Sequence, residues 1–261
     1  MNYFFFLDHP DKDLKSSVEI CNYEPISNFY NKPQDKKNIY IFYIESGSWK
    51  NEIIEEIDYG DRKIIEKNDL PNFLKNKNIF ISLSSRKIKS NHSPIIDNSL
   101  DSTPAWRSNI KIFNNNSSCS YQGELPSSLL NKKLSLVSCS PFLQLDKDNF
   151  QNYFYLVNMY KEPIIEKFSV DILDSNKNIL KQLTCYTNTI NCHDLTFLKE
   201  FNYKNKMFVF RSQSYGGIPI YFSKSSDNSQ MSLEHTHPPT EYLFSGNRMF
   251  FQKRKKSHWF E

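Results

Sequence analysis

The residue types best suited to chemistry gather in one segment, Ser232–Arg248. His235 and His237 are two residues apart, so on a β-strand their side chains point the same way. Two imidazoles in that arrangement can share one divalent ion such as zinc, iron or manganese, and Glu241 can supply an oxygen ligand. The same histidines also suit contact with a small ligand, or a structural role in which neutral imidazoles hold the turn into Pro238-Pro239. These roles all stay open at this point.

The spacing His-x-His-x3-Glu resembles the first metal-binding motif of the cupins, with His235, His237 and Glu241 on the ligand positions. The resemblance covers this short segment and implies a metal-dependent enzyme of cupin-like chemistry. The sequence departs from the cupin pattern at Ser229, where cupins usually have glycine. The only histidine after Glu241 is His258, and no Pro-x-Gly precedes it as a second cupin motif requires. The cupin-like enzyme is therefore the alternative hypothesis and not the leading one.

A second set of candidates combines aromatic, amide and charged side chains of the kind that bind sugars or anions. Trp and Tyr rings offer flat faces, and an Arg guanidinium offers a fork of hydrogen-bond donors. The same residues are also typical of a core or an interface around a Gly-Glu-Leu-Pro turn, and Asn-Arg after a glycine is typical of an exposed hairpin turn. The predicted ligand-binding residues are Trp106, Arg107, Tyr121, Gln122, Glu124, Asn247 and Arg248.

Three further segments contain reactive residue types but have a spacing that favours a structural role. Cys192-His193-Asp194 contains the members of a nucleophilic triad, yet neighbours on an extended chain point to opposite faces. Tyr215-Gly216-Gly217 indicates a turn with positive φ at one or both glycines, and without a following Lys-Ser/Thr it is not a phosphate loop. Lys253–Lys256, beside Trp259 and Phe260, is typical of a solvated tail, with contact to anionic lipid as the other interpretation.

The elements that must position these residues are β-strands. The chain is rich in Phe, Tyr and Ile and poor in Ala, a composition that favours sheet over helix. At Phe168, Val170 and Ile172 apolar side chains recur at every second residue, the period of a strand with one face in solvent. No long segment keeps a period of 3.6. We therefore expect an all-β protein of two tandem β-sandwich domains, jelly-roll or immunoglobulin-like, with the second domain enlarged.

Two stretches of the chain resemble each other and indicate a duplication. Ile39–Lys75 and Phe168–Lys199 share the order strand, polar turn, strand, short strand, and then Asp-Leu followed by Phe-Leu-Lys. Upstream of them, Tyr3–Leu7 resembles Tyr153–Val157. Any two β-meanders share strand and turn spacing, so the hypothesis depends on the shared Asp-Leu and Phe-Leu-Lys positions. We expect the Asp-Leu segments to form single helical turns.

The polar segment Asn91–Pro104 has few strand formers and marks the expected domain boundary. The predicted domains are residues 1–95 and residues 104–261. The second domain is longer because of added segments at Trp106–Leu145 and Met231–Glu261. If the two halves began as equals, the additions are where we expect the function to lie.

Composition limits the class of partner and the compartment. The net charge is +4, from 33 basic and 29 acidic residues, and no basic stripe indicates a nucleic-acid partner. The N-terminal apolar run is too short for a signal peptide or an integral membrane segment, and five cysteines without paired spacing favour reduced thiols in the cytoplasm.

The leading hypothesis is a non-catalytic binding or assembly module without a cofactor. It would recognise a small polar ligand such as a sugar, or a protein partner, and it allows a homo-oligomer. The alternatives are the cupin-like enzyme with a divalent metal, and an oligomeric structural protein.

Overall fold

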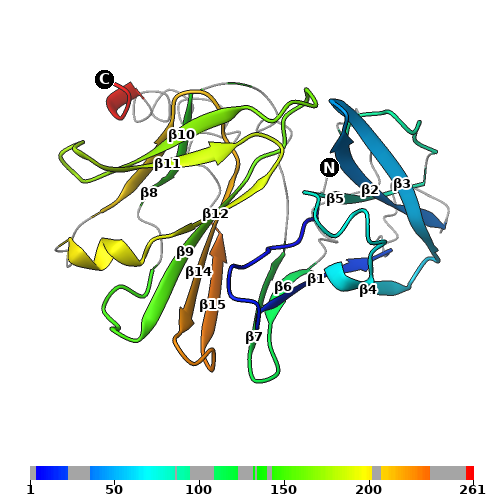
Figure 1. The fold of residues 1–261 in the computed structure, drawn as a ribbon, viewed down its shortest axis with the longest axis horizontal. Coiled ribbons are helices and arrows are strands. Elements are labelled where there is room, and N and C mark those ends of the chain that lie inside the picture. Colours follow the sequence, from blue (N-terminus) through cyan, green and yellow to red (C-terminus); the bar gives the residue numbers. More distant parts are fainter. Residues whose placement is uncertain are drawn as a thin grey trace, which may run out of the picture. The chain divides into compact units, whose positions relative to one another are not determined.

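The computed structural model describes residues 4–22, 36–85, 87–94, 109–122, 132, 134–139, 143–201, 207–235 and 257–261. Within these ranges the chain is built mainly from β-strands in four small antiparallel sheets, which confirms the expected all-β class (Figure 1). No helix in the same ranges is long and apolar enough to span a membrane. The strands are β1 (Lys15–Cys21), β2 (Lys37–Glu45), β3 (Ser48–Ile57), β4 (Arg62–Glu66), β5 (Phe80–Ser84), β6 (Asn109–Phe113), β7 (Ser118–Gln122), β8 (Ser135–Cys139), β9 (Phe150–Val157), β10 (Lys167–Leu173), β11 (Ile179–Tyr186), β12 (Ile190–Asp194), β13 (Val209–Ser212), β14 (Ile218–Ser225) and β15 (Met231–His235).

The chain forms two compact units. The first comprises Met1–Ser127 and Lys161–Ile164, and the second comprises Ser128–Tyr160 and Ile165–Glu261. Most of the expected boundary segment lies outside the described residues, and the predicted domain limits stay a prediction. β6 and β7, which follow that segment, belong to a sheet of the first unit, because β6 pairs with β1 and β7 pairs with β6.

The first unit contains two antiparallel sheets, with the strand orders β4-β1-β6-β7 and β3-β2-β5. β2 and β3 form a hairpin that closes through Ser46 and Gly47, whose φ angles of 49° and 68° match the twist that a two-residue turn needs. Near the N-terminal end, Phe4 forms an isolated antiparallel bridge with Ile81 of β5. This bridge places the apolar residues after Phe4 beside the β3-β2-β5 sheet.

Apolar side chains from both sheets form the core of the first unit. Val18 and Ile20 of β1 alternate with polar neighbours, so both side chains enter the core from one face of their strand. Ile39 and Ile41 of β2 enter the core from the other sheet. The complete set of buried core residues is Phe4, Phe6, Val18, Ile20, Ile39, Ile41, Tyr43, Ile57, Ile65, Leu70, Leu74, Ile79, Ile81 and Leu83.

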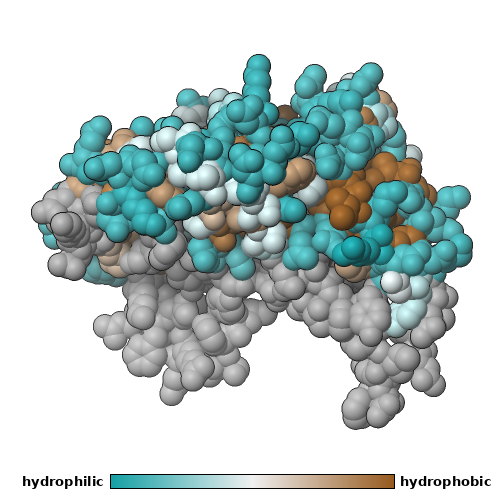
Figure 2. Space-filling model, turned by 90° about the horizontal axis from the view of Figure 1, so that it is seen from below, coloured by the Kyte–Doolittle hydropathy of each residue, from teal (hydrophilic) through white to brown (hydrophobic). Residues whose placement is uncertain are grey.

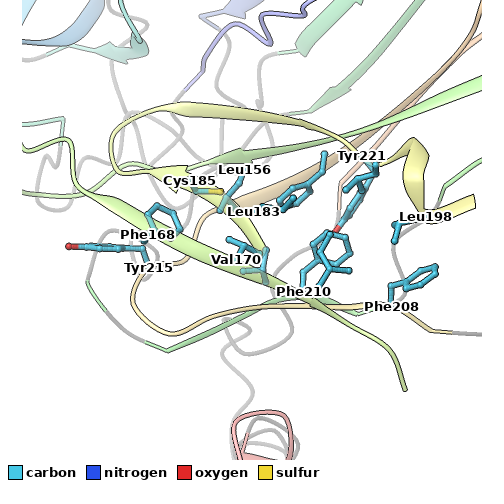
Figure 3. Packing of buried hydrophobic residues seen from close by; sticks show 14 of the residues in the cluster. Leu156, Phe168, Val170, Leu183, Cys185, Leu198, Phe208, Phe210, Tyr215 and Tyr221 are labelled. Atoms are coloured by element: carbon cyan, nitrogen blue, oxygen red, sulfur yellow. The ribbon is translucent and has the colours of Figure 1, made fainter. Parts of the chain in front are cut away.

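The second unit also contains two antiparallel sheets, with the orders β11-β10-β13-β8 and β12-β9-β14-β15. Its core is formed by side chains from both sheets, and the ring of Phe154 stacks on that of Tyr221 at a centroid distance of 5.5 Å. The expected alternation at Phe168, Val170 and Ile172 is present in β10, and all three side chains are buried in this core. Figure 3 shows Phe168 and Val170 in it. The sequence period therefore identified the inward face correctly. The prediction that the opposite face lies in solvent was wrong at Asp171, which is 5% exposed.

Short helical turns follow β4 and β12. They are the 3₁₀ helices η1 (Lys67–Asp69) and η4 (Thr196–Glu200). Asp194 Oδ1 accepts a hydrogen bond from Thr196 N at 2.7 Å, one residue before the cap position of η4, which Leu195 occupies. At the other Asp-Leu segment, Asp69 ends η1 and does not begin it. Lys199 then donates from Nζ to three backbone oxygens, at 2.7 Å to that of Lys147, 3.1 Å to that of Asp148 and 2.6 Å to that of Phe150.

The visible face in Figure 2 is covered mainly by hydrophilic side chains, with hydrophobic ones gathered in one area. The most exposed large hydrophobic side chains in the described residues are Ile165 at 60% and Ile64 at 52%. Most ion pairs in the described part of the chain lie at the surface, for example Lys63 with Glu55. Such exposed pairs contribute roughly 0–1 kcal/mol each. The fold therefore rests on burial of apolar surface.

Candidate ligand-binding site

Buried asparagines fix the loops at one end of the second unit. Asn158 follows β9 directly, and its Nδ2 donates to Gly216 O at 2.7 Å. Its Oδ1 accepts from Asn188 N at 2.9 Å, and the side chain of Asn188 accepts in turn from Tyr160 N at 2.6 Å. Asn158 is 0% exposed, so these hydrogen bonds replace water for groups that would otherwise be buried without partners. Three loops are thereby held in one arrangement.

Gly217 is required at this end by close packing and not by its φ angle. A Cβ atom there would lie 2.7 Å from Leu156 Cδ1 and 2.7 Å from Val157 O. The expectation of positive φ at Gly216 or Gly217 was wrong, because the positive-φ glycines of the described chain are Gly47 and Gly60. The backbone of the β13–β14 loop passes against β9, and only a residue without a side chain fits.

The loops held by Asn158 and Asn188 form what we call the asparagine frame. A carboxylate, an ammonium group and a phenol meet on this frame. Tyr215 donates its hydroxyl hydrogen bond to Glu166 Oε2 at 2.6 Å, and Lys132 Nζ donates to Glu166 Oε1 at 3.3 Å. Lys132 Nζ also lies 5.2 Å from the centroid of the Tyr215 ring. We call Lys132, Glu166 and Tyr215 the end cluster. They come from three different segments, which the backbone bridge between Lys132 and Tyr215 and the start of β10 bring together.

The protonation states of Glu166 and Tyr215 in the end cluster are fixed at neutral pH. The hydrogen bond from Tyr215 and the ammonium group of Lys132 hold the pKa of the Glu166 carboxyl below its usual value. Burial, followed by the hydrogen bond to the Glu166 carboxylate, raises the pKa of the Tyr215 phenol above its usual value. The phenol is therefore protonated and the carboxylate ionised, which suits hydrogen bonding to a ligand and does not suit nucleophilic attack by the tyrosine.

The end cluster combines a buried anchor with exposed groups. Figure 3 shows Tyr215 at one end of the core, with its ring directed away from the other labelled residues. The ring is 1% exposed and packs against Tyr160 and Phe168, each at a centroid distance of 5.2 Å. The side chains of Lys132 and Glu166 are 54% and 42% exposed. A ligand can thus reach both charged groups while Tyr215 keeps them in place.

A thiol and an imidazole also meet in the second unit, at Cys185 and His193. Cys185 Sγ lies 3.4 Å from His193 Nε2. Burial raises the pKa of the Cys185 thiol to about 12. Burial, with a smaller contribution from the charge of Lys181, lowers the pKa of His193. Both groups are therefore neutral at pH 7, and because Cys185 is 0% exposed its thiol is part of the core and is not a nucleophile.

The His193 environment predicts a loss of stability in mild acid. Its pKa in the folded protein lies below the usual 6.5, whereas the unfolded chain takes up the proton near 6.5. Stability is therefore complete above about pH 6.5 and falls as the pH drops from there toward the lowered pKa. Urea unfolding at pH 7.5 and pH 5.5 should show a larger acid-induced loss for the wild type than for His193→Leu. Equal losses in the two proteins would contradict this role.

Most of the residues predicted from the sequence lie outside the described residues. These are Trp106, Arg107, Glu124, His237, Glu241, Asn247 and Arg248. The ligand-binding and metal-binding roles that the sequence suggested for them stay predictions.

The remaining predicted residues lie in sheets of different units. Tyr121 is on β7 opposite Ile110 and is 7% exposed, as expected for the alternative of a core aromatic. Gln122 ends β7 opposite Asn109. His235 ends β15 opposite Ile220 and is half-buried.

No group of three or more His, Cys, Asp or Glu side chains that could hold a metal ion occurs in the described ranges. Cys21, Cys119, Cys185 and Cys192 are free thiols. Sequence reasoning missed Lys132 and Glu166 because each alone is typical of a solvated surface residue. Tyr215 was noted as part of a turn, and its partner Glu166 lies 49 residues earlier.

Comparisons with known proteins give no relative from which a function can be transferred. The chain matches no protein-family model, no curated protein and no solved structure. The functional argument therefore rests on the geometry of this chain.

Proposed function

We propose that the protein is a non-catalytic binding module built from two copies of one β-sandwich, and that the second copy binds a small polar ligand at the end cluster. The observation that supports this proposal most is the arrangement of Lys132, Glu166 and Tyr215 on the buried asparagine frame. The ligand class is a hydroxylated molecule such as a sugar, which needs both a hydrogen-bond acceptor and a charged donor.

The strand orders of the two units support the duplication. Adding eight to each label of β4-β1-β6-β7 gives β12-β9-β14-β15, and adding eight to β3-β2-β5 gives β11-β10-β13. Every pairing is antiparallel in both units. Agreement over seven strands goes beyond the strand and turn spacing that any two meanders share.

Two buried asparagines occupy equivalent places in the proposed copies. Asn22 follows β1 and donates from its backbone N to Asp61 O at 3.0 Å, and Asn158 follows β9 and donates from its backbone N to Thr189 O at 3.1 Å. Asp61 and Thr189 each directly precede the next paired strand, β4 or β12. The residues before them, Gly60 and Asn188, both have positive φ, of 87° and 55°.

The strand pairing changes one part of the sequence alignment. The sequence matched Tyr3–Leu7 with Tyr153–Val157, but Tyr153–Val157 lies in β9, whose counterpart by strand order is β1. Phe4 pairs with Ile81 of β5, and β8 pairs with β13, so the N-terminal run corresponds to β8. The matched segments shared aromatic composition and not position in the fold.

The end cluster distinguishes the second copy from the first. When the count is continued past the paired residues of the strands, Lys37 matches Glu166 and Ser84 matches Tyr215. Lys132 lies three residues before β8, in the second unit. A change confined to one copy is what specialisation for binding after a duplication would produce.

The ion pair of the end cluster is suited to binding because folding does not depend on it. An exposed ion pair such as Lys132 with Glu166 contributes roughly 0–1 kcal/mol to stability, so its hydrogen bonds can be exchanged for those of a ligand at little cost. Tyr215 keeps the carboxylate in place, which lowers the ordering cost of binding. The exposed ring of Tyr186 lies one residue from Thr187, whose Oγ1 accepts from Glu166 N at 2.8 Å.

A glycan array followed by calorimetry tests the proposal. We expect saturable binding of at least one neutral or amino sugar by the wild type. Glu166→Gln and Lys132→Met should each weaken that binding about tenfold or more, because each removes a charge-assisted hydrogen bond of about 1.5–3 kcal/mol.

Lys147→Met is the matched control. Lys147 is exposed, lies 4.8 Å from the ring of Phe150, and is located at the opposite end of β9. Its replacement should leave sugar binding unchanged. Sugar binding that is equally strong in Glu166→Gln, Lys132→Met and the wild type would place the site elsewhere.

A protein partner is the second candidate, favoured by the exposed side chains of Ile165 at 60% and Tyr186 at 43% beside the same cluster. If a partner or a second copy covers this end, Ile165→Ser with Tyr186→Ser should lower the assembly mass seen by light scattering. A monomeric wild type that binds sugar would exclude a second copy in this role.

A further inference from the structure

The last described segment of the chain packs on the β11-β10-β13-β8 sheet, on the face opposite to the core of the second unit. Ser257–Glu261 forms one helical turn, in which Phe260 N and Glu261 N both donate to Ser257 O at 2.9 and 3.0 Å. Trp259 is 9% exposed and packs against Leu136, Leu173 and Val209. Figure 1 shows this turn near β8 and β10.

A buried arginine on the sheet binds the turn. Arg211 of β13 donates from Nη1 to Trp259 O, and its guanidinium carbon lies 5.8 Å from the centroid of the Phe260 ring. Arg211 Nε donates to Asp171 Oδ2 at 3.2 Å, and Gln182 Nε2 donates to Asp171 Oδ1 at 2.8 Å. Gln182 therefore holds the Asp171 carboxylate, and that carboxylate orients the guanidinium so that its Nη1 donor faces the turn.

The corresponding face of the first unit has a different chemistry. Phe42 of β2 pairs with Phe80 of β5 as Asp171 of β10 pairs with Arg211 of β13, and both phenylalanines are 0% exposed. A purely apolar pair favours permanent burial. The Asp171–Arg211 ion pair instead offers a hydrogen-bond donor to the carbonyl of Trp259. The hydrophobic contacts of Trp259 and Phe260 lie on either side of this hydrogen bond. This combination is typical of peptide recognition.

The turn has the properties of a bound peptide. A single helical turn is unstable in water by itself, so the sheet supplies its order. The turn adds no strand to any sheet in the described chain, so its release would break no β ladder. Residues 236–256 join it to β15 in the same chain, so a released segment stays on the molecule that carries its binding face.

We propose that this face of the sheet is a peptide-docking surface whose resident occupant is Ser257–Glu261, and that the segment detaches and rebinds while the second unit stays folded. The recognised features are a tryptophan, a following aromatic ring and the carbonyl between them that Arg211 binds. The surface therefore fits short segments with an aromatic pair, and the chain's own segment competes with them.

Hydrogen exchange on the wild-type protein tests the detachment without any mutation. The amides of Phe260 and Glu261 should exchange about a hundredfold faster, or more, than those of Val170 and Phe210, because local release needs less free energy than global unfolding. Exchange of all four amides at one common rate would show that the turn is a fixed part of the fold and would overturn the proposal.

Peptide binding tests the surface. A fluorescent peptide with the sequence of residues 257–261 is titrated into the full chain carrying Trp259→Ala and Phe260→Ala, and into the wild type. The open variant should bind the peptide saturably. The wild type should bind the peptide at least about tenfold more weakly, because its own segment competes for the surface. Arg211→Met added to the open variant should abolish binding.

A peptide with alanine in place of tryptophan is the matched control and should not bind the open variant. Equal binding to the wild type and the open variant, or no saturable binding to a folded open variant, would overturn the proposal. Far-UV circular dichroism establishes whether the open variant is folded. If it is not, the exchange rates in the wild type decide the question.

Discussion

Replacing Asp171 by alanine is expected to lower the free energy of unfolding by about 3–5 kcal/mol. The side chains of Asp171 and Arg211 are 7% and 13% exposed and pair at 3.2 Å. Without the carboxylate, the guanidinium stays in a poorly hydrated site with its Nε donor unpaired, and Gln182 loses its acceptor. Urea unfolding followed by far-UV circular dichroism measures the loss.

The double variant Asp171→Leu with Arg211→Met is the control for this result. It removes both charges and fills the space with apolar groups, so no ion is left buried alone. It should lose less than half as much stability as Asp171→Ala, although the hydrogen bond to Trp259 is also lost. If the single and double variants lose the same amount, the cost comes from packing and the argument from an unpaired charge is wrong.

Asn158→Ala is expected to cost about 3 kcal/mol. The substitution leaves Gly216 O and Asn188 N, two backbone groups at the same end of the unit, without the partners that Asn158 now supplies at 2.7 and 2.9 Å. Each buried polar group without a partner costs about 1–3 kcal/mol. Thermal and urea unfolding both report this loss.

Asn176→Ala is the matched control, because Asn176 lies in the exposed β10–β11 turn. A surface substitution of this kind should change stability by about 0.5 kcal/mol or less. The Asn158 variant should also weaken ligand binding at the end cluster, since its loops carry Tyr160 and Tyr215. A stability loss for Asn158→Ala as small as that for Asn176→Ala would contradict the role given to the asparagine frame.

Local patterns predicted individual strands well. The alternation at Phe168, Val170 and Ile172 lies within β10, and Ile39–Ile44 lies within β2. The reason is that the side-chain period of a strand is a property of neighbouring residues along the chain. The helical turn after Asp194-Leu195 was predicted for the same reason, since the Asp194 carboxylate accepts from Thr196 N only two residues away.

The candidate site could not be predicted in the same way. Lys132 and Glu166 are 34 residues apart, and Glu166 and Tyr215 are 49 residues apart. Each is an ordinary surface or turn residue in its local sequence, and nothing in that sequence indicates the partner. The need for glycine at position 217 could not be predicted either, because it comes from close contacts with Leu156 and Val157 on another strand.

The sequence by itself determined that this chain forms strands and which face of β10 carries core side chains, because side-chain period and turn chemistry act between near neighbours. The tertiary structure alone decided which strands pair, as when β6 joins β1 and when Phe4 joins β5. It also decided that a lysine, a glutamate and a tyrosine meet at one end of the second unit. Pairing and convergence depend on the total burial and hydrogen bonding of the whole chain, which no short segment encodes.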